Sequence, residues 1–165
     1  MGGFYHTETF STLHRLNRNN VDQPEEQLQE FCQSRPIALV LPCLYSELSR
    51  KALKGILKKL KEVTYLNEIV TTLGRANEDE FSLAQEYFSV LPNNYKIIWD
   101  DGERMTSIFN LLKENGLEIG EPGKGRAAWI AYGYILAEGK SEVIVSMTVI
   151  SLRTAANSSH VYAIR

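Results

Sequence analysis

The sequence predicts an α/β protein with a mainly parallel sheet and helices on both of its faces. Three observations support this class. Four short runs rich in apolar or β-branched residues recur at residues 37–41, 69–73, 95–99 and 142–145. Segments with helical features separate these runs, and the connections between them are short. Strands and helices that alternate in this way are typical of βαβ units, in which the strands run parallel.

Residues 1–35 are expected to form an N-terminal extension with one short helix. Asp22 stands where a helix cap is expected, and Pro24 falls in the first turn, followed by acidic residues near the positive end of the helix dipole. The helix should continue to about Cys32 and end before Pro36, because a proline restricts the residue that precedes it.

The run at residues 37–41 is expected to be a strand buried on both faces, because it is continuously apolar and too short for a helix. A helix is predicted over residues 48–63, with leucine and isoleucine on one face and lysines on the other. We interpret these lysines as a solvated helix face and not as a nucleic-acid-binding patch. They are Lys51, Lys54, Lys58, Lys59 and Lys61.

The same strand–helix unit recurs twice. Residues 69–73 are predicted to be a strand, and the helix after it opens at Asn77, which has a glutamate three positions later in the pattern of a capping box. Residues 95–99 are the third predicted strand. It ends at residues 100–102, and the next helix ends at Gly116.

A glycine-rich stretch, GEPGKGR at residues 120–126, precedes the last predicted helix. Glycine allows close approach of the backbone to a ligand, while Lys124 and Arg126 place two cations beside a helix N-terminus, which also favours anions. The stretch is therefore a candidate diphosphate site. An ordinary turn with solvated cations fits these seven residues equally well.

The last predicted helix covers residues 125–138 and leads into the fourth strand. Its expected buried side chains are Trp129, Tyr132, Ile135 and Leu136. Trp99, on the third strand, is also expected in the core.

Right-handed crossovers favour the strand order 3-2-1-4, numbered along the chain. Ligands of such sheets bind beyond the carboxyl ends of the strands, where the strand order reverses. Residues 42–47, 74–75 and 100–101 follow the first three strands, so we expect them to converge at one edge of the sheet. Lys124 is predicted to lie on the same side as Pro42.

The composition limits the class of protein. A chain of 165 residues with 44% hydrophobic and 23% charged residues is expected to fold as a globular domain. A net charge of −2 argues against a surface devoted to nucleic acid. Two cysteines cannot build a disulfide framework, which favours a cytoplasmic location, and no apolar run approaches the ~20 residues of a membrane span. The pattern predicts no particular oligomeric state.

Two motifs carry a resemblance to a known family. LPCLYSE at residues 41–47 and GEPGKGR at residues 120–126 together resemble the GT-A glycosyltransferases, and among them the glucosyl-3-phosphoglycerate synthase-like proteins of bacteria. The resemblance covers residues 36–145. It implies a Rossmann-like domain, the N-terminal half of a GT-A fold, in a hexosyltransferase. Such an enzyme transfers a sugar from a nucleotide-diphosphate sugar to a small acceptor such as a phosphoglycerate, with Mg²⁺ or Mn²⁺.

The same resemblance implies a set of nucleotide-sugar-binding residues. The loop after the first strand would surround the nucleoside, with Glu47 or Ser46 as a polar contact, and Lys124 would lie near the uracil or the diphosphate. Many relatives have an acidic or hydroxylated residue where this chain has Gly74-Arg75. The implied site residues are Pro42, Cys43, Leu44, Ser46, Glu47, Gly74, Gly123, Lys124 and Gly125.

The metal motif of the family is missing. An Asp-x-Asp motif is due directly after the fourth strand, where its carboxylates hold the cation that neutralises the leaving diphosphate. This chain has Ser146 and Met147 there, and no acidic residue follows Glu142. Shifted by one nucleotide, permitted codons around Met147 encode His-Asp-Cys-Asp. We therefore interpret residues 146–165 as an out-of-frame tail; a naturally divergent tail is the alternative.

The function predicted from the sequence follows from these points. The chain is expected to be a glycosyltransferase fragment that binds a nucleotide-diphosphate sugar but is inactive by itself, with no catalytic residue assigned. The alternative is a non-catalytic α/β domain that binds a nucleotide or phosphate.

Overall fold

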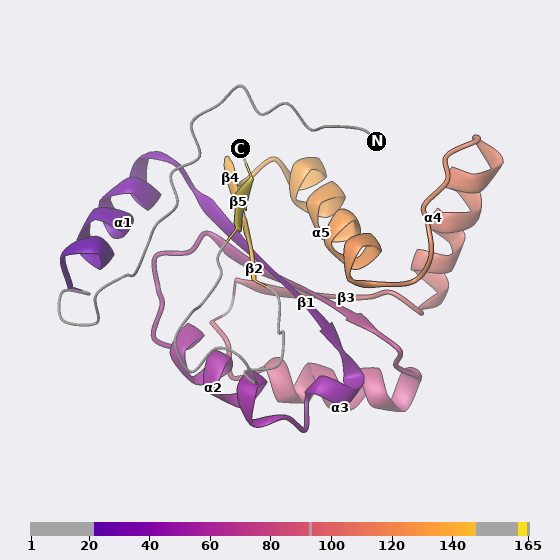
Figure 1. The fold of residues 1–165 in the computed structure, drawn as a ribbon, viewed down its shortest axis with the longest axis horizontal. Coiled ribbons are helices and arrows are strands. Elements are labelled where there is room, and N and C mark those ends of the chain that lie inside the picture. Colours follow the sequence, from indigo (N-terminus) through magenta and orange to yellow (C-terminus); the bar gives the residue numbers. More distant parts are fainter. Residues whose placement is uncertain (1–21, 93, 148–161, 165) are drawn as a thin grey trace, which may run out of the picture.

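The computed structural model describes residues 22–92, 94–147 and 162–164. Within these residues one sheet lies between helices (Figure 1). The helices are α1 (Asp22–Ser34), α2 (Lys51–Leu60), α3 (Glu78–Phe88), α4 (Glu103–Glu114) and α5 (Lys124–Glu138), with a short 3₁₀ helix η1 (Tyr45–Glu47). The strands are β1 (Ile37–Leu44), β2 (Glu68–Gly74), β3 (Tyr95–Trp99), β4 (Val143–Ser146) and β5 (Tyr162–Ile164).

The strand order is β3-β2-β1-β4-β5. The first four strands run parallel, which confirms the predicted class and the order 3-2-1-4. β5 pairs antiparallel with β4 at one edge. Three residues are too few for a periodicity to predict this strand. Residues 148–161 and 165 lie outside the described part of the chain, so the interpretation of residues 146–165 as an out-of-frame tail stays a prediction, as do the domain boundaries.

β1 is longer than the apolar run because it continues through Pro42 to Leu44. Proline lacks the N–H that a central strand needs to donate. In β1 the carbonyl of Val40 accepts from Met147 N–H on the β4 side, at 2.8 Å, and Pro42 faces the same side. Within the described residues β4 ends at Ser146, which pairs with Val40, so no described residue of β4 stands opposite Pro42.

The two faces of β1 pack against different helices (Figure 1). Leu39 and Leu41 share a buried cluster with leucines of α2 and with Phe88 of α3. Ala38 and Val40, on the opposite face, share a second cluster with Ala131 and Ile135 of α5. The prediction of helices on both faces is therefore confirmed, and so is the solvated lysine face of α2.

The predicted burial of α5 was wrong at two positions. Trp129 is 52% exposed and Leu136 is 73% exposed, whereas Ile135 is buried and Tyr132 half-buried as predicted. The buried face is instead marked by Ala127 and Ala131, whose small side chains let the helix approach the sheet.

Trp99 is half-buried, and its ring stacks on Phe81 with a centroid separation of 4.9 Å. The residues described include no helix with the length and apolarity that crossing a lipid bilayer requires.

Candidate functional site

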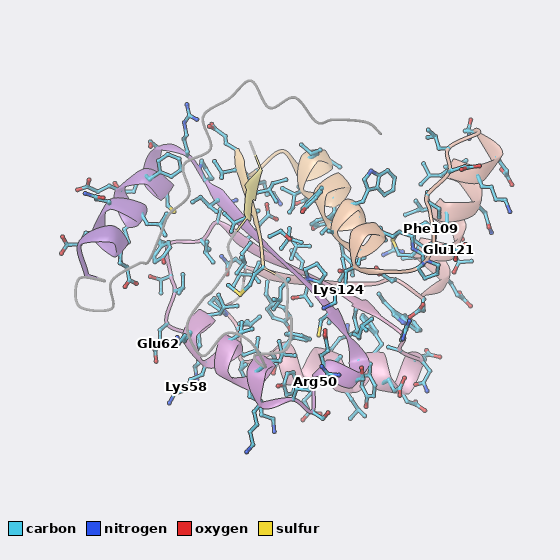
Figure 2. All side chains as sticks on the ribbon, in the orientation of Figure 1. Arg50, Lys58, Glu62, Phe109, Glu121 and Lys124 are labelled. Carbon is cyan, nitrogen blue, oxygen red and sulfur yellow. The ribbon has the colours of Figure 1, made fainter. Side chains whose placement is uncertain are left out.

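A cleft of about 200 Å³ lies at the carboxyl ends of β1, β2 and β3 and is bounded by the start of α5. This is the place where the strand ends were predicted to converge. Figure 2 shows Lys124 at the beginning of α5, close to the end of β1. The lining residues are Pro42, Cys43, Leu44, Gly74, Arg75, Asp100, Asp101, Pro122, Gly123, Lys124, Arg126 and Ala127.

Most of the site residues implied by the family resemblance lie together in this cleft. Of that set, the lining includes Pro42, Cys43, Leu44, Gly74, Gly123 and Lys124. Ser46 and Gly125 are exposed outside the lining, and Glu47 is buried beside it. The implied set did not include Arg75, Asp100, Asp101, Pro122, Arg126 and Ala127. Their signal was positional: Arg75, Asp100 and Asp101 follow strand ends, Pro122 precedes α5, and Arg126 and Ala127 belong to its first turn.

Glu47 anchors the lysine of the cleft. Its Oε1 lies 3.4 Å from Lys124 Nζ, and its Oε2 accepts a hydrogen bond from Leu44 N–H at 3.0 Å. The Glu47 side chain is only 5% exposed, against 40% for Lys124. The 3₁₀ turn η1 follows β1 and places the buried Glu47 carboxylate against Lys124. Lys124 lines the cleft, and Glu47 does not.

The thiol of Cys43 is held in its protonated form. Burial, together with the negative charge of Glu47 and a hydrogen bond to it, raises the pKa of Cys43 to about 12, and the charge of Lys124 offsets only part of this. A thiolate is the nucleophilic form of cysteine. Cys43 therefore contributes shape to the cleft wall and no nucleophile.

The environment of Asp100 disfavours the ionised form of its carboxyl group. The residue is 7% exposed, and its Oδ1 has no hydrogen-bond partner among the described residues. Burial and the charge of Asp101 raise the pKa of Asp100 to about 6, while the charge of Arg126 lowers it in part. Asp101 is better satisfied, because its Oδ2 accepts from Ala76 N–H at 3.1 Å.

The turn after β3 fixes both carboxylates. Gly102 packs so tightly that a Cβ atom there would lie 2.8 Å from a ring carbon of Trp99. The Trp99 indole is itself held, because Nε1 donates to the Ala76 carbonyl at 2.9 Å. Glycine at this position therefore lets the chain turn against the indole without displacing it, and the turn follows Asp100, which lines the cleft.

Arg126 enters the cleft from the first turn of α5. Its Cζ lies 4.6 Å from the ring centroid of Phe109 on α4, a cation–π contact that holds the guanidinium plane (Figure 2 labels Phe109). Arg126 Nε is buried and has no hydrogen-bond partner among the described residues. With Arg75 and Lys124, Arg126 gives the cleft three cationic side chains, an arrangement that suits an anionic ligand.

The described residues do not assemble a metal centre. They contain no group of three or more histidine, cysteine, aspartate or glutamate side chains that could hold an ion. Asp100 and Asp101 are adjacent, but Asp101 is committed to Ala76 N–H and three cations line the same cleft. This donor set does not fit a divalent cation.

The chain is similar to two curated enzymes. Over 144 residues it is 35% identical to the glucosyl-3-phosphoglycerate synthase of Persephonella marina, an alignment that covers 87% of this chain and 36% of that enzyme. The corresponding enzyme of Methanococcoides burtonii is 30% identical over 135 residues, which are 81% of this chain and 33% of the enzyme. No family model matches the chain.

Solved structures give a more distant likeness. One is glucosyl-3-phosphoglycerate synthase from Mycobacterium tuberculosis in complex with Mn²⁺, UDP and glucosyl-3-phosphoglycerate. It is 19% identical with a TM-score of 0.47, and the match covers 84% of this chain and 40% of that one. A complex of the same enzyme with Mn²⁺, UDP and phosphoglyceric acid gives the same identity and TM-score. The predicted resemblance is confirmed by the curated relatives: this chain is similar to glucosyl-3-phosphoglycerate synthases along most of its length, and it spans about one third of theirs.

Proposed function

We propose that the chain is the nucleotide-sugar-binding part of a glucosyl-3-phosphoglycerate synthase, corresponding to the N-terminal half of a GT-A fold. The donor is UDP-glucose and the acceptor is a phosphoglycerate. The observation that carries the proposal is the position of Lys124, supported by buried Glu47 at the converging ends of β1, β2 and β3. The sequence identity of 35% to an enzyme named glucosyl-3-phosphoglycerate synthase supports a glucosyl donor and a phosphoglycerate acceptor.

Each part of the cleft has a role in binding. Lys124 and the first N–H groups of α5 face the diphosphate, because both favour negative charge. The apolar wall formed by Pro42, Cys43 and Leu44 packs against the nucleoside. A bound Mn²⁺ or Mg²⁺ would neutralise the leaving diphosphate in a full-length relative, but the described residues form no group of three or more side chains that could hold it.

The chain by itself is therefore expected to bind the donor without transferring glucose. This is tested by incubating it with UDP-glucose and 3-phosphoglycerate, with and without MnCl₂, and measuring released UDP. No release above the uncatalysed background is expected. Turnover that depends on Mn²⁺ would contradict the assignment of a binding function without catalysis and would direct attention to Asp100 and Asp101.

Ligand-dependent thermal stability separates the proposal from its alternative, a domain that binds any phosphate. UDP and UDP-glucose are expected to raise the melting temperature at concentrations where inorganic phosphate does not, because ligands that bind only the native state stabilise it. Equal shifts with inorganic phosphate would favour the alternative. The cytoplasmic location expected from the two cysteines stays a prediction.

A further inference from the structure

Two complementary polar groups of the cleft lack partners. Asp100 Oδ1 is an acceptor, Arg126 Nε is a donor, and neither has a hydrogen-bond partner among the described residues. They come from different elements, the end of β3 and the first turn of α5, yet both residues line the same cleft. Buried polar groups are nearly always hydrogen-bonded, and leaving them unpaired is costly. A ligand bound in the cleft could supply the missing partners.

The surroundings keep both side chains available to such a ligand. Gly74 stands beside Asp100, and a Cβ atom there would be in ordinary van der Waals contact with Asp100 Oδ2, at 3.7 Å, so glycine at this position leaves the Oδ2 side of the carboxylate without a side chain against it. Phe109 occupies one face of the Arg126 guanidinium, which leaves the N–H edge for hydrogen bonds. Asp101, by contrast, is already used by Ala76 N–H.

The ligand edge that fits is a ring N–H next to a carbonyl. Asp100 would accept from the N–H, and Arg126 would donate to the oxygen beside it. Uracil presents this pair at N3 and O4, and guanine presents it at N1 and O6. Cytosine and adenine present the reverse, a ring nitrogen that accepts beside an amino group that donates, and so leave the Asp100 carboxylate facing a lone pair.

We propose that Asp100 and Arg126 recognise the Watson–Crick edge of the nucleotide base and so select uracil over cytosine. The inference rests on the proposed function and deepens it, because it assigns base selection to side chains that the family motifs do not include. Lys124 holds the diphosphate, which uridine and cytidine nucleotides share, so its contribution does not depend on the base.

The test is isothermal titration calorimetry with UDP and CDP at pH 7.5, where Asp100 is ionised. The wild-type chain is expected to bind UDP at least about tenfold more tightly than CDP, since a mismatched base leaves buried polar groups unpaired. Asp100→Asn is the informative variant. Its amide can accept from uracil N3–H or, after rotation, donate to cytosine N3, so the preference should fall to roughly threefold or less.

Glu103→Gln is the matched control, because it neutralises an exposed carboxylate three positions away that does not line the cleft. Its preference for UDP should equal that of the wild type. Circular dichroism and the melting temperature confirm that each variant folds.

The outcomes separate this inference from the proposed function. Equal affinities of the wild type for UDP and CDP, both weakened by Lys124→Ala, would leave the proposed function standing and overturn base selection by Asp100. A wild-type preference for UDP that persists unchanged in Asp100→Asn would also overturn it. No binding of either nucleotide to the wild type would overturn both.

Discussion

Glu47 and Lys124 stand 77 positions apart in the chain and form an ion pair of 3.4 Å that joins the end of β1 to the start of α5. The carboxylate is buried and the ammonium group is partly exposed, so the pair presents its positive member to the cleft. Glu47 also accepts from Leu44 N–H, which fixes its position independently of Lys124. We therefore propose that Glu47 positions Lys124, and the direct nucleoside contact that the family resemblance implies for Glu47 stays a separate prediction.

The first prediction concerns this pair. Glu47→Gln keeps an acceptor for Leu44 N–H but removes the charge that holds Lys124, so affinity for UDP should fall by about three- to tenfold in calorimetry. In a Lys124→Ala background the same change should have little further effect, because the two side chains act as a unit. An equal loss in both backgrounds would show that Glu47 acts independently of Lys124.

The second prediction concerns the two cysteines. Cys43 is buried with its pKa raised to about 12, whereas Cys32 lies at partial exposure on α1 with its pKa raised less by burial. Iodoacetamide at pH 8 should therefore modify Cys32 in the native protein and leave Cys43 unmodified. Mass spectrometry of peptides gives the extent at each site, and denatured protein provides the control in which both react. Faster modification of Cys43 than of Cys32 would contradict the buried, protonated thiol.

The third prediction concerns pH and Asp100. Burial, the largest cause, raises the pKa of Asp100 from its ordinary value of 3.8 to about 6, so between these values the native state holds more protons than the unfolded state. The contribution of Asp100 to stability therefore falls as pH rises from about 4 to 6 and stays unfavourable above. Asp101 and Arg126 are the charged groups that set this shift beside burial.

Asp100→Asn removes that penalty. At pH 7.5 it should stabilise the fold by on the order of 1 kcal/mol, which corresponds to roughly 2–4 °C in melting temperature for a chain of this size. Near pH 4 the wild-type carboxyl group is protonated and the difference should vanish. A variant that is less stable than the wild type at pH 7.5 would mean that the Asp100 charge is compensated in the native protein.

The fourth prediction concerns the turn that aims Asp100. Gly102→Ala would place a methyl group 2.8 Å from the Trp99 ring, so it should destabilise the fold by about 1–3 kcal/mol in urea unfolding. Gly55→Ala is the control, because α2 has nothing within 4 Å of the new methyl group and alanine favours a helix by roughly 1 kcal/mol. Equal effects of the two substitutions would contradict the tight packing of the turn.

The sequence predicted the strands around the site more accurately than the side-chain contacts within it. Continuous apolar runs and glycine or proline breaks identified four strands and their order, because buried parallel strands leave a strong local pattern. Trp129 and Leu136 were misplaced because helical spacing alone does not say which face meets the sheet. Here that face is formed by Ala127, Ile130, Ala131 and Ile135. The orphaned groups of Asp100 and Arg126 depend on contacts with Asp101, Phe109 and Gly74, which are distant in sequence or set by a turn, so no local pattern could show them.

The central claim is that Lys124 binds the diphosphate of a uridine nucleotide in the cleft, and calorimetry with UDP tests it most directly. A charge-assisted contact to phosphate contributes about 1.5–3 kcal/mol, so Lys124→Ala should weaken UDP binding by roughly tenfold or more. Lys58→Ala, which removes an exposed cation from α2, is the control and should bind UDP as the wild type does (Figure 2). Equal affinities of the wild type and Lys124→Ala for UDP would contradict the account.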